Sequence, residues 1–399
     1  LEKSINWQLA IIKNINQFNA DIETEKKIEG TIRYKDISWT KKEFKDLFKI
    51  GDIVYVKKIE DNFYSLQQLP KINGGIVVID PYTGRILALS GGFSFRNSEF
   101  NRATQALRQP GSAFKPFIYA AALDQGYSPN AVFFDEPIEI PIDGTQPYRP
   151  KNYDGEFLGP VTLNEALGKS INTIAVQLAT EIGIERVRAI AKDFGIRSLI
   201  GTGPAVALGA SEVNLLELTA SYAGFLSSGR SVSPIGWLDL KVRGDEEVLM
   251  SVDRSDGHQV IDNHAGAALL YMLRTVVETG TGRRARIPGL DLAGKTGTSQ
   301  SLKDAWFIGF NAEFVCGVWI GNDDNTSLEG VTGGGLPAQL WSDIMLKLTK
   351  THVPKALPFM TPEEFEVYAS YSVPEEKSPT GKSTNRSILK ALLETLFGE

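Results

Sequence analysis

Residues 108–123 read Arg108-Gln-Pro-Gly-Ser-Ala-Phe-Lys-Pro-Phe-Ile-Tyr-Ala-Ala-Ala-Leu123. A proline–glycine turn precedes Ser112, and an apolar run closes the stretch. Because a helix that is apolar on all sides must be buried, the stretch predicts a core helix over residues 112–125. Ser112 then lies at the helix N-terminus, where free N–H groups and the helix dipole favour a developing negative charge. Lys115 lies one turn further along the same face.

Lys115 has the chemistry of a base for Ser112. Burial lowers the pKa of a lysine, and the neutral amine can then take the proton of a serine hydroxyl. A serine activated in this way is a nucleophile that needs no histidine. The Ser-x-x-Lys pattern also occurs at residues 38–41 and 387–390. For the motif alone, a helix-capping serine followed by a surface lysine therefore stays open as an alternative.

A second candidate motif, Ser170-Ile-Asn172, lies in a polar turn between two helical stretches. Residues two apart in such a turn can both point into one cleft, with Ile171 packed inward. The alternative is that Ser170 only caps the helix that follows it.

The third motif, Lys295-Thr-Gly-Thr298, ends a predicted strand over residues 290–298. On a strand, Lys295 and Gly297 face one way and Thr296 and Thr298 the other. Gly297 removes a side chain, so that a substrate backbone can come close. An extended edge strand can also pair with a peptide-like substrate through its main chain. An ordinary strand that ends in a polar turn is the alternative.

The segment 289–296 also satisfies the nucleotide-binding P-loop pattern. That motif needs an apolar strand before it and a helix after it. Here a basic, proline-broken segment precedes the pattern and a strand hairpin is predicted to follow it, so we reject nucleotide binding.

The composition narrows the function further. The chain has 399 residues, 42% hydrophobic and 23% charged, as in an ordinary globular protein. A net charge of −6 argues against a nucleic-acid partner, which needs a basic face. The chain has only three histidines and one cysteine, which offers few residues from which to build a zinc site or a Ser-His-Asp triad. We expect no metal or cofactor, and we expect Cys316 to be a small core residue in a buried strand.

From the sequence given we expect no signal peptide at its start, and no run approaches the ~18 apolar residues of a membrane span. It begins with Leu1 rather than methionine, so we expect a fragment whose absent N-terminus could have held an anchor.

Short strand-like runs fill residues 1–70 and suggest a small β-rich, OB-like barrel. Strands are predicted again at 75–79, 85–89, 290–298, 305–310 and 314–320, with mainly helical sequence over 162–279. Strands at both ends with helices between them indicate an α+β fold, in which sequence-distant strands share one sheet. From residue 353 the chain becomes Pro-, Glu- and Lys-rich, which favours a linker or tail over 353–399 with one weak helix at 387–397.

Segments around the three motifs carry a resemblance to a known family. The chain resembles the transpeptidase domain of class A, bifunctional penicillin-binding proteins over residues 71–352, and residues 1–70 resemble their OB-like domain. The resemblance implies a central, mainly antiparallel sheet with helices on both faces, as in serine β-lactamases. The glycosyltransferase domain and membrane anchor expected upstream are absent from this sequence. The segments are Phe100-Asn-Arg-Ala-Thr104, Arg108-Gln-Pro-Gly-Ser-Ala-Phe-Lys-Pro116, Ala207-Leu-Gly-Ala-Ser-Glu212, Gly280-Thr-Gly-Arg-Arg-Ala285 and Asp304-Ala-Trp-Phe-Ile-Gly309.

The resemblance implies a peptidoglycan DD-transpeptidase. Lys115 would take the proton of Ser112, which attacks the D-Ala-D-Ala amide of a stem peptide and forms an acyl-enzyme. Ser170, helped by Lys295, would relay the proton to the departing D-alanine. An amine of a neighbouring strand would then form the cross-link, and β-lactams would acylate the same serine.

The resemblance also implies roles in binding. Backbone N–H groups of Ser112 and Thr298 would form the oxyanion hole. Thr296 and Thr298 would hold the substrate carboxylate and Asn172 its amide. The expected partners are stem peptides, β-lactams and cell-wall synthesis proteins. The expected location is the periplasm, with the full-length protein anchored in the cytoplasmic membrane.

Two departures leave alternatives open. Ile171 stands where the β-lactamase pattern has aspartate, which favours a synthase over a class A hydrolase. Only Glu212 and Glu217 remain, by elimination, as candidates to activate a deacylating water. A DD-carboxypeptidase or β-lactamase-type hydrolase is one alternative, and a non-catalytic β-lactam sensor is another.

Overall fold

The computed structural model describes residues 5–142, 144, 146–244, 247–252, 257–351 and 355–370. The chain divides into two compact units, Leu1–Lys71 with Gly92–Phe100, and Ile72–Gly91 with Asn101–Glu399. The boundary after residue 70 was expected from the sequence, whereas nothing there indicated that residues 92–100 belong to the smaller unit.

The smaller unit is a closed barrel with the strand order β1-β2-β3-β5-β4. Alternate residues along the strands point inward, so that Ile12, Ile32 and Val56 are fully buried. This five-stranded closure is the arrangement predicted for an OB-like domain. The elements are β1 (Trp7–Ile15), β2 (Asn19–Thr24), β3 (Glu29–Arg33), α1 (Phe44–Leu47), β4 (Ile53–Glu60) and β5 (Phe63–Gln67).

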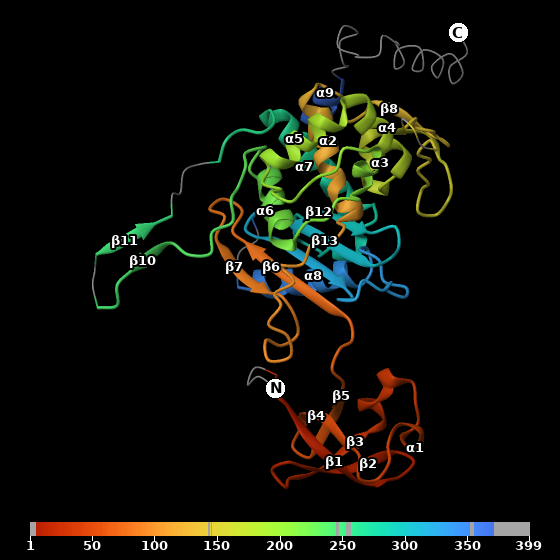
Figure 1. Cartoon of the computed structure of the whole chain (residues 1–399), viewed down its shortest axis with the longest axis vertical. Coiled ribbons are helices and arrows are strands. Elements are labelled where there is room, and N and C mark those ends of the chain that lie inside the picture. Colours follow the sequence, from red (N-terminus) through yellow and green to blue (C-terminus); the bar gives the residue numbers. More distant parts are fainter. Residues whose placement is uncertain are drawn as a thin grey trace. The chain divides into compact units, whose positions relative to one another are not determined.

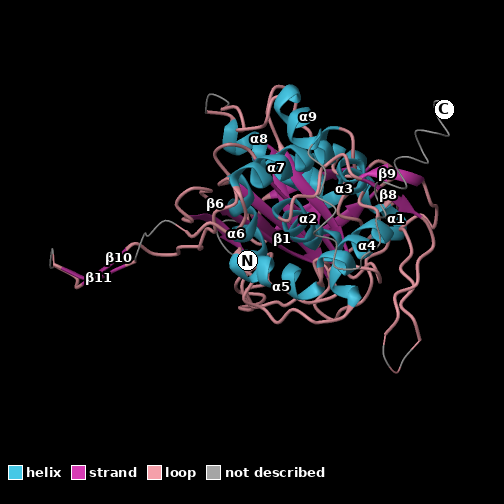
Figure 2. Ribbon diagram, turned by 90° about the horizontal axis from the view of Figure 1, so that it is seen from above, coloured by secondary structure: helices cyan, strands magenta, loops and turns pink. Residues whose placement is uncertain are grey.

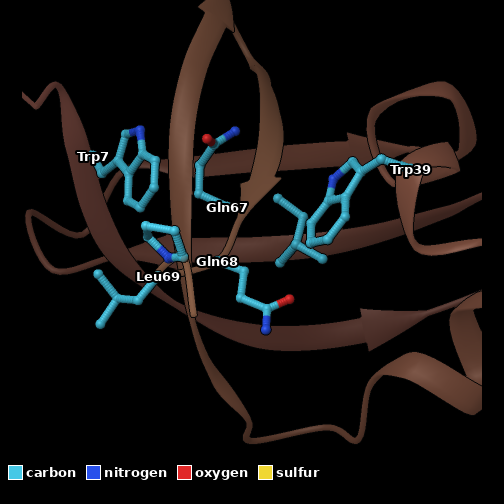
Figure 3. A pocket seen from close by; sticks show the side chains of 7 residues that line it. Trp7, Trp39, Gln67, Gln68 and Leu69 are labelled. Carbon is cyan, nitrogen blue, oxygen red and sulfur yellow. The ribbon is translucent and has the colours of Figure 1, made fainter. Parts of the chain in front are cut away.

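A pocket of about 420 Å³ opens on the barrel beside the end of β5. Figure 3 shows the indole rings of Trp7 and Trp39 at its two sides, with Gln67 between them in this view. Trp7 also packs against the ring of Phe93, with centroids 5.2 Å apart, so the segment 92–100 contacts the barrel.

The larger unit is built on a five-stranded sheet with the order β12-β13-β14-β6-β7, in which every neighbouring pair is antiparallel. β12 is therefore an edge strand, as predicted for the third motif. The first two strands in the sequence lie beside the last three, which confirms one sheet of sequence-distant strands. The strands are β6 (Asn73–Ile79), β7 (Ile86–Ser90), β12 (Ala293–Thr298), β13 (Asp304–Phe310) and β14 (Val315–Gly321).

The two faces of the sheet pack into two hydrophobic cores because successive side chains of a strand point to opposite faces. In Figure 1, α2, α5, α6 and α7 lie on one side of the sheet and α8 lies on the other. Cys316 is fully buried in the core beneath α8, as expected. Val77, Ile79, Trp306 and Ile308 face the larger helical group, whereas Val78, Phe307, Cys316 and Val318 face α8.

The predicted core helix is present but begins differently. Residues Gly111–Phe114 form a 3-10 turn, η3, and the α-helix α2 (Lys115–Asp124) starts one turn later. Pro116 fits within its first two positions, where the missing N–H costs nothing. The other helices of this unit are α3 (Leu163–Lys169), α4 (Asn172–Ile182), α5 (Ile184–Asp193), α6 (Leu215–Leu226), α7 (Asn263–Glu278), α8 (Leu336–Thr349) and α9 (Pro362–Ser370).

The stretch 162–279 is less uniformly helical than the sequence suggested. It contains a two-stranded hairpin, β10 (Asp239–Lys241) and β11 (Val248–Ser251), which extends away from the helices (Figure 2). All of its strand residues are exposed, so no alternation of buried and exposed positions marks it in the sequence. A further pair, β8 (Val132–Asp135) and β9 (Gly159–Thr162), precedes α3.

The described part of the predicted linker is packed against the protein rather than loosely attached. Residues 355–370 pack on the helical core, where Phe365 of α9 stacks on Tyr271 of α7 with ring centroids 4.0 Å apart. The predicted helix at 387–397 lies outside the described residues. Within the described ranges, no helix combines the length and the apolar character that a membrane crossing requires.

Candidate active site

Ser112 lies on the 3-10 turn η3, which packs against the end of the edge strand β12. Two glycines allow this close approach. A Cβ on Gly111, whose φ is +55°, would lie 2.3 Å from the carbonyl oxygen of Thr298. A Cβ on Gly297 would lie 2.3 Å from the carbonyl oxygen of Pro110. The first and third motifs therefore meet backbone to backbone.

Lys115 connects the first motif to the second. Its ammonium is fully buried and donates to the carbonyl oxygens of Ser170 at 2.6 Å and Ile171 at 3.1 Å. It also donates to Asn172 Oδ1 at 2.7 Å and, at 3.3 Å, to Ser170 Oγ. Among the hydrogen bonds of the described residues, none joins Lys115 Nζ to Ser112 Oγ. The serine and the lysine are linked through the 3-10 turn instead, where the Lys115 N–H donates to the Ser112 carbonyl.

Ser170 lies between α3 and α4 in a left-handed conformation with φ 61°. A non-glycine residue rarely adopts this conformation, and such strain is concentrated at functional sites. Ser170 is the C-cap of α3 and Ile171 is the N-cap of α4, so Ser170 does not cap the helix that follows it. The turn instead presents the Ser170 hydroxyl to the amino groups of two lysines.

The second of these groups is Lys295 on β12. Its Nζ donates to Ser170 Oγ at 2.8 Å and to the Thr296 carbonyl at 3.2 Å. The three motifs are therefore brought together, with the Ser170 hydroxyl accepting from both lysines.

Both lysines are fully buried, and none of the ion pairs among the described residues includes either of them. Burial holds the pKa of Lys115 well below its usual value, and the charge of Lys295 lowers that pKa further. Burial also lowers the pKa of Lys295, to about 7. Near neutral pH the site can therefore hold one neutral amine and one ammonium, the states that a base and an anion-binding group require.

The strand pattern predicted that the two threonines of the third motif face away from Lys295, but Lys295 Nζ reaches Thr296 Oγ1 at 3.5 Å, so the prediction is wrong for Thr296. Thr296 Oγ1 lies 2.7 Å from Thr281 Oγ1, and Thr298 Oγ1 accepts from the Gly333 N–H at 3.0 Å. Both hydroxyls thus contact protein groups here, and their role toward a carboxylate stays a prediction.

Asn172 is held on two sides. Its Nδ2 donates to the Lys151 carbonyl at 2.7 Å, which leaves Oδ1 to accept from Lys115. The neighbouring Asn152 also contacts the second motif, because its Oδ1 accepts from the Asn172 N–H at 2.9 Å. No motif of the sequence includes residues 151 and 152, and nothing in their spacing from Asn172 indicates the contact.

One candidate for a deacylating base has a structural role. Both carboxylate oxygens of Glu217 accept hydrogen bonds, among them those from the Arg197 and Asn214 N–H groups. Glu217 and Asn214 form a capping box at the start of α6. Glu212, the other candidate, is exposed.

Comparisons with known proteins point to one family. Residues 74–345 match the family model described as the penicillin-binding protein transpeptidase domain, and residues 1–72 match the penicillin-binding protein OB-like domain. Among curated relatives, penicillin-binding protein 1A of Rickettsia typhi is 34% identical over 94% of this chain and 51% of its own length. Penicillin-binding protein 1A of Neisseria flavescens is 35% identical over 81% of this chain and 42% of its length.

Two solved structures of penicillin-binding proteins have a similar fold. Penicillin-binding protein 1A from Haemophilus influenzae superposes with a TM-score of 0.82 at 28% identity, over 90% of this chain and 59% of that one. PonA1 of Mycobacterium tuberculosis in complex with penicillin V gives a TM-score of 0.66 at 26% identity, over 77% and 85%.

The fold and the matched domains define a penicillin-binding transpeptidase unit preceded by an OB-like unit. The chain belongs to the penicillin-binding protein transpeptidase family, and the relatives named above are penicillin-binding proteins 1A, of class A. It spans about half the length of the curated relatives it matches.

Proposed function

We propose that this chain cross-links peptidoglycan stem peptides by DD-transpeptidation, with Ser112 as the nucleophile that forms the acyl-enzyme. One observation carries the proposal: two buried lysines converge on the Ser170 hydroxyl, and one of them, Lys115, lies one turn from Ser112 in the chain. Because both pKa values are lowered, the pair can supply a base and an acid without histidine. Peptidoglycan lies outside the cytoplasmic membrane, so the proposed place of action is extracytoplasmic.

In the proposed reaction, neutral Lys115 gives up one of its present hydrogen bonds, the Ser112 hydroxyl donates to its nitrogen, and the nitrogen takes the proton. Ser112 Oγ then bonds to the penultimate D-alanine carbonyl carbon, and the amide bond to the terminal D-alanine breaks. The proton passes through Ser170 to the departing amine. An amine of a second stem peptide then attacks the ester, forms the new amide and returns the proton to Ser112.

The N–H groups of Ser112 and Thr298 are proposed to stabilise the oxyanion. The close backbone contact between Gly111 and Thr298 supports this assignment, since it holds the 3-10 turn beside the strand. One such donor contributes about 10²–10³ in rate. Charged Lys295 would attract the substrate carboxylate beside Thr296 and Thr298.

Mass spectrometry after treatment with benzylpenicillin tests the nucleophile. We expect one adduct on Ser112 and none in Ser112→Ala. Ser38→Ala is the matched control because Ser38 and Lys41 repeat the Ser-x-x-Lys spacing in the smaller unit. An adduct on another residue, or none at all, would refute the proposal.

A hydrolase on the same fold gives a different outcome. With a stem pentapeptide donor and a D-amino-acid acceptor, a transpeptidase forms the exchange product, whereas a carboxypeptidase only releases D-alanine. An acyl-enzyme that decays within seconds would favour a β-lactamase. The capping role of Glu217 speaks against that outcome. Labelling of Ser112 with neither product would favour the non-catalytic sensor.

A further inference from the structure

The first turn of α4 carries the Ser170–Asn172 motif but has no cap of its own. Its N-cap residue is Ile171, whose side chain has no acceptor for the first free N–H groups of the helix. Asn152, from the loop before β9, supplies one. Its Oδ1 accepts from the N–H of Asn172 at 2.9 Å and from that of Thr173 at 3.4 Å. The helix is therefore capped by a residue distant in sequence.

Two further hydrogen bonds hold the side-chain amide of Asn152 in place. Its Nδ2 donates to Asp135 Oδ1 at 2.8 Å and to the Glu156 carbonyl at 2.9 Å. Two donated and two accepted hydrogen bonds satisfy the whole side chain. The orientation of the cap is thus fully determined.

Asp135, at the end of β8, is 1% exposed and accepts from three directions. Besides Asn152, the Thr173 hydroxyl donates to Oδ1 and the Leu158 N–H donates to Oδ2 at 2.9 Å. None of the ion pairs among the described residues includes Asp135. The N-terminus of α4 favours a negative charge at this place.

The same loop also orients the side chain of Asn172. Its Nδ2 can only donate and faces the Lys151 carbonyl, so its Oδ1 must face Lys115. Lys151 and Asn152 together hold the backbone and the amide of Asn172. Ser170, two residues before Asn172, has a left-handed backbone.

We propose that Asn152 is a positioning residue of the active site, which holds the Ser170–Asn172 turn against Lys115, and that Asp135 orients Asn152. The inference rests on the proposed function, because it refines the same site. Without the cap, the first turn of α4 frays and the Ser170 hydroxyl moves relative to the two lysines. A displacement near 1 Å slows such a reaction by about 10²-fold.

The test uses stopped-flow acylation by a chromogenic β-lactam, which separates the binding constant from the acylation rate constant. We expect Asn152→Ala to lower the acylation rate constant by roughly 10- to 100-fold, with the binding constant little changed. Asn214→Ala is the matched control, because Asn214 is the N-cap residue of another helix, α6. Its Oδ1 accepts from the Glu217 N–H, and the substitution removes this cap. Its melting temperature falls but its acylation rate constant stays that of the parent chain.

A rescue experiment separates positioning from folding. In Asn152→Asp, a carboxylate faces the Asp135 carboxylate with no hydrogen between them, and acylation slows. In the double variant Asn152→Asp with Asp135→Asn, the new amide at 135 donates to the new carboxylate at 152, and acylation recovers at least in part. This comparison also decides the matter if Asn152→Ala does not fold.

Two outcomes would overturn the inference. One is an Asn152→Ala enzyme whose folded molecules, counted by titration with the β-lactam, acylate at the parent rate. The other is a double variant that is no faster than Asn152→Asp. Failure of the parent chain to be acylated on Ser112 is a separate result, which refutes the proposed function itself.

Discussion

Lys295 Nζ donates a 2.8 Å hydrogen bond to Ser170 Oγ, and this bond joins the edge strand of the sheet to the turn between α3 and α4. Lys115, from α2, reaches the same hydroxyl at 3.3 Å. Three separate elements thus meet at one oxygen atom. A hydroxyl bonded to Lys115 can take a proton from that amine and give its own proton to the departing amine, which is the relay that the proposed reaction needs.

Removal of the Ser170 hydroxyl should therefore slow acylation strongly. We expect Ser170→Ala and Ser170→Gly each to lower the acylation rate constant by about 10²–10⁴-fold, the usual contribution of a positioned proton-transfer group. Their stabilities should differ, because glycine adopts φ 61° without strain and alanine does not. Thermal melts should show Ser170→Gly to be the more stable of the two. Equal acylation rates in the parent and both variants would contradict the relay.

The pH profile of acylation should report the lysine pair. Neutral Lys115 is the base, and its pKa is well below the usual value, so the rate rises on the acid side as this amine loses its proton. Lys295 must be charged to attract a carboxylate, and its pKa of about 7 predicts a fall in the second-order rate constant above that pH. Both limbs belong to the coupled pair.

Lys295→Arg tests the assignment of the falling limb. A guanidinium keeps its charge throughout the accessible pH range, so the variant should retain only the rising limb, at a lower maximal rate. A falling limb at the same pH in Lys295→Arg would assign that limb to another group.

The local patterns of the sequence placed the second motif in a turn between helices and the third on an edge strand, whereas Ser112 lies on a 3-10 turn that precedes the predicted helix. Short strand-like runs predicted the strands, and an all-round apolar run predicted α2. The signature Asn214-x-x-Glu217 is also readable as a capping box, so the structural role of Glu217 could have been found. Local patterns succeed where a residue and its partners lie within one element.

The support of the second motif could not be predicted in this way. Asn152, Asp135 and Asn172 come from three segments that meet only in the folded chain. The exposed hairpin of β10 and β11 gave no signal for a different reason, since none of its strand residues is buried. Contacts between distant polar side chains leave no period in the sequence.

Stability should rise with pH above neutrality. In the folded chain Lys295 is neutral above a pH of about 7, whereas in the unfolded chain it binds a proton up to its usual pKa of 10.5. The unfolded state therefore binds more protons in this window, and the free energy of unfolding increases by up to about 1.4 kcal/mol per pH unit for this group. Denaturant unfolding between these pH values measures the slope.

Lys295→Met should remove this contribution and flatten the slope. Lys192→Met is the matched control, because that side chain is exposed on α5 and its ammonium is in water in both states. An unchanged slope in Lys295→Met would show that the buried amine does not titrate as proposed.

Substitution of Gly297 should disturb both stability and acylation. A Cβ at this position would lie 2.3 Å from the Pro110 carbonyl oxygen, 2.9 Å from Ala113 Cβ and 3.1 Å from Trp306 Cβ. These neighbours belong to backbone and packed core, so Gly297→Ala must push η3 away from β12, at a cost of about 1–3 kcal/mol. Because Ser112 lies on η3, the acylation rate constant should fall as well.

Gly203→Ala is the control, since nothing lies within 4 Å of its Cβ position and its φ is −86°. Denaturant unfolding and stopped-flow acylation on both variants check the expectation. A Gly297→Ala chain as stable and as reactive as Gly203→Ala would show that the close contact between η3 and β12 is not needed.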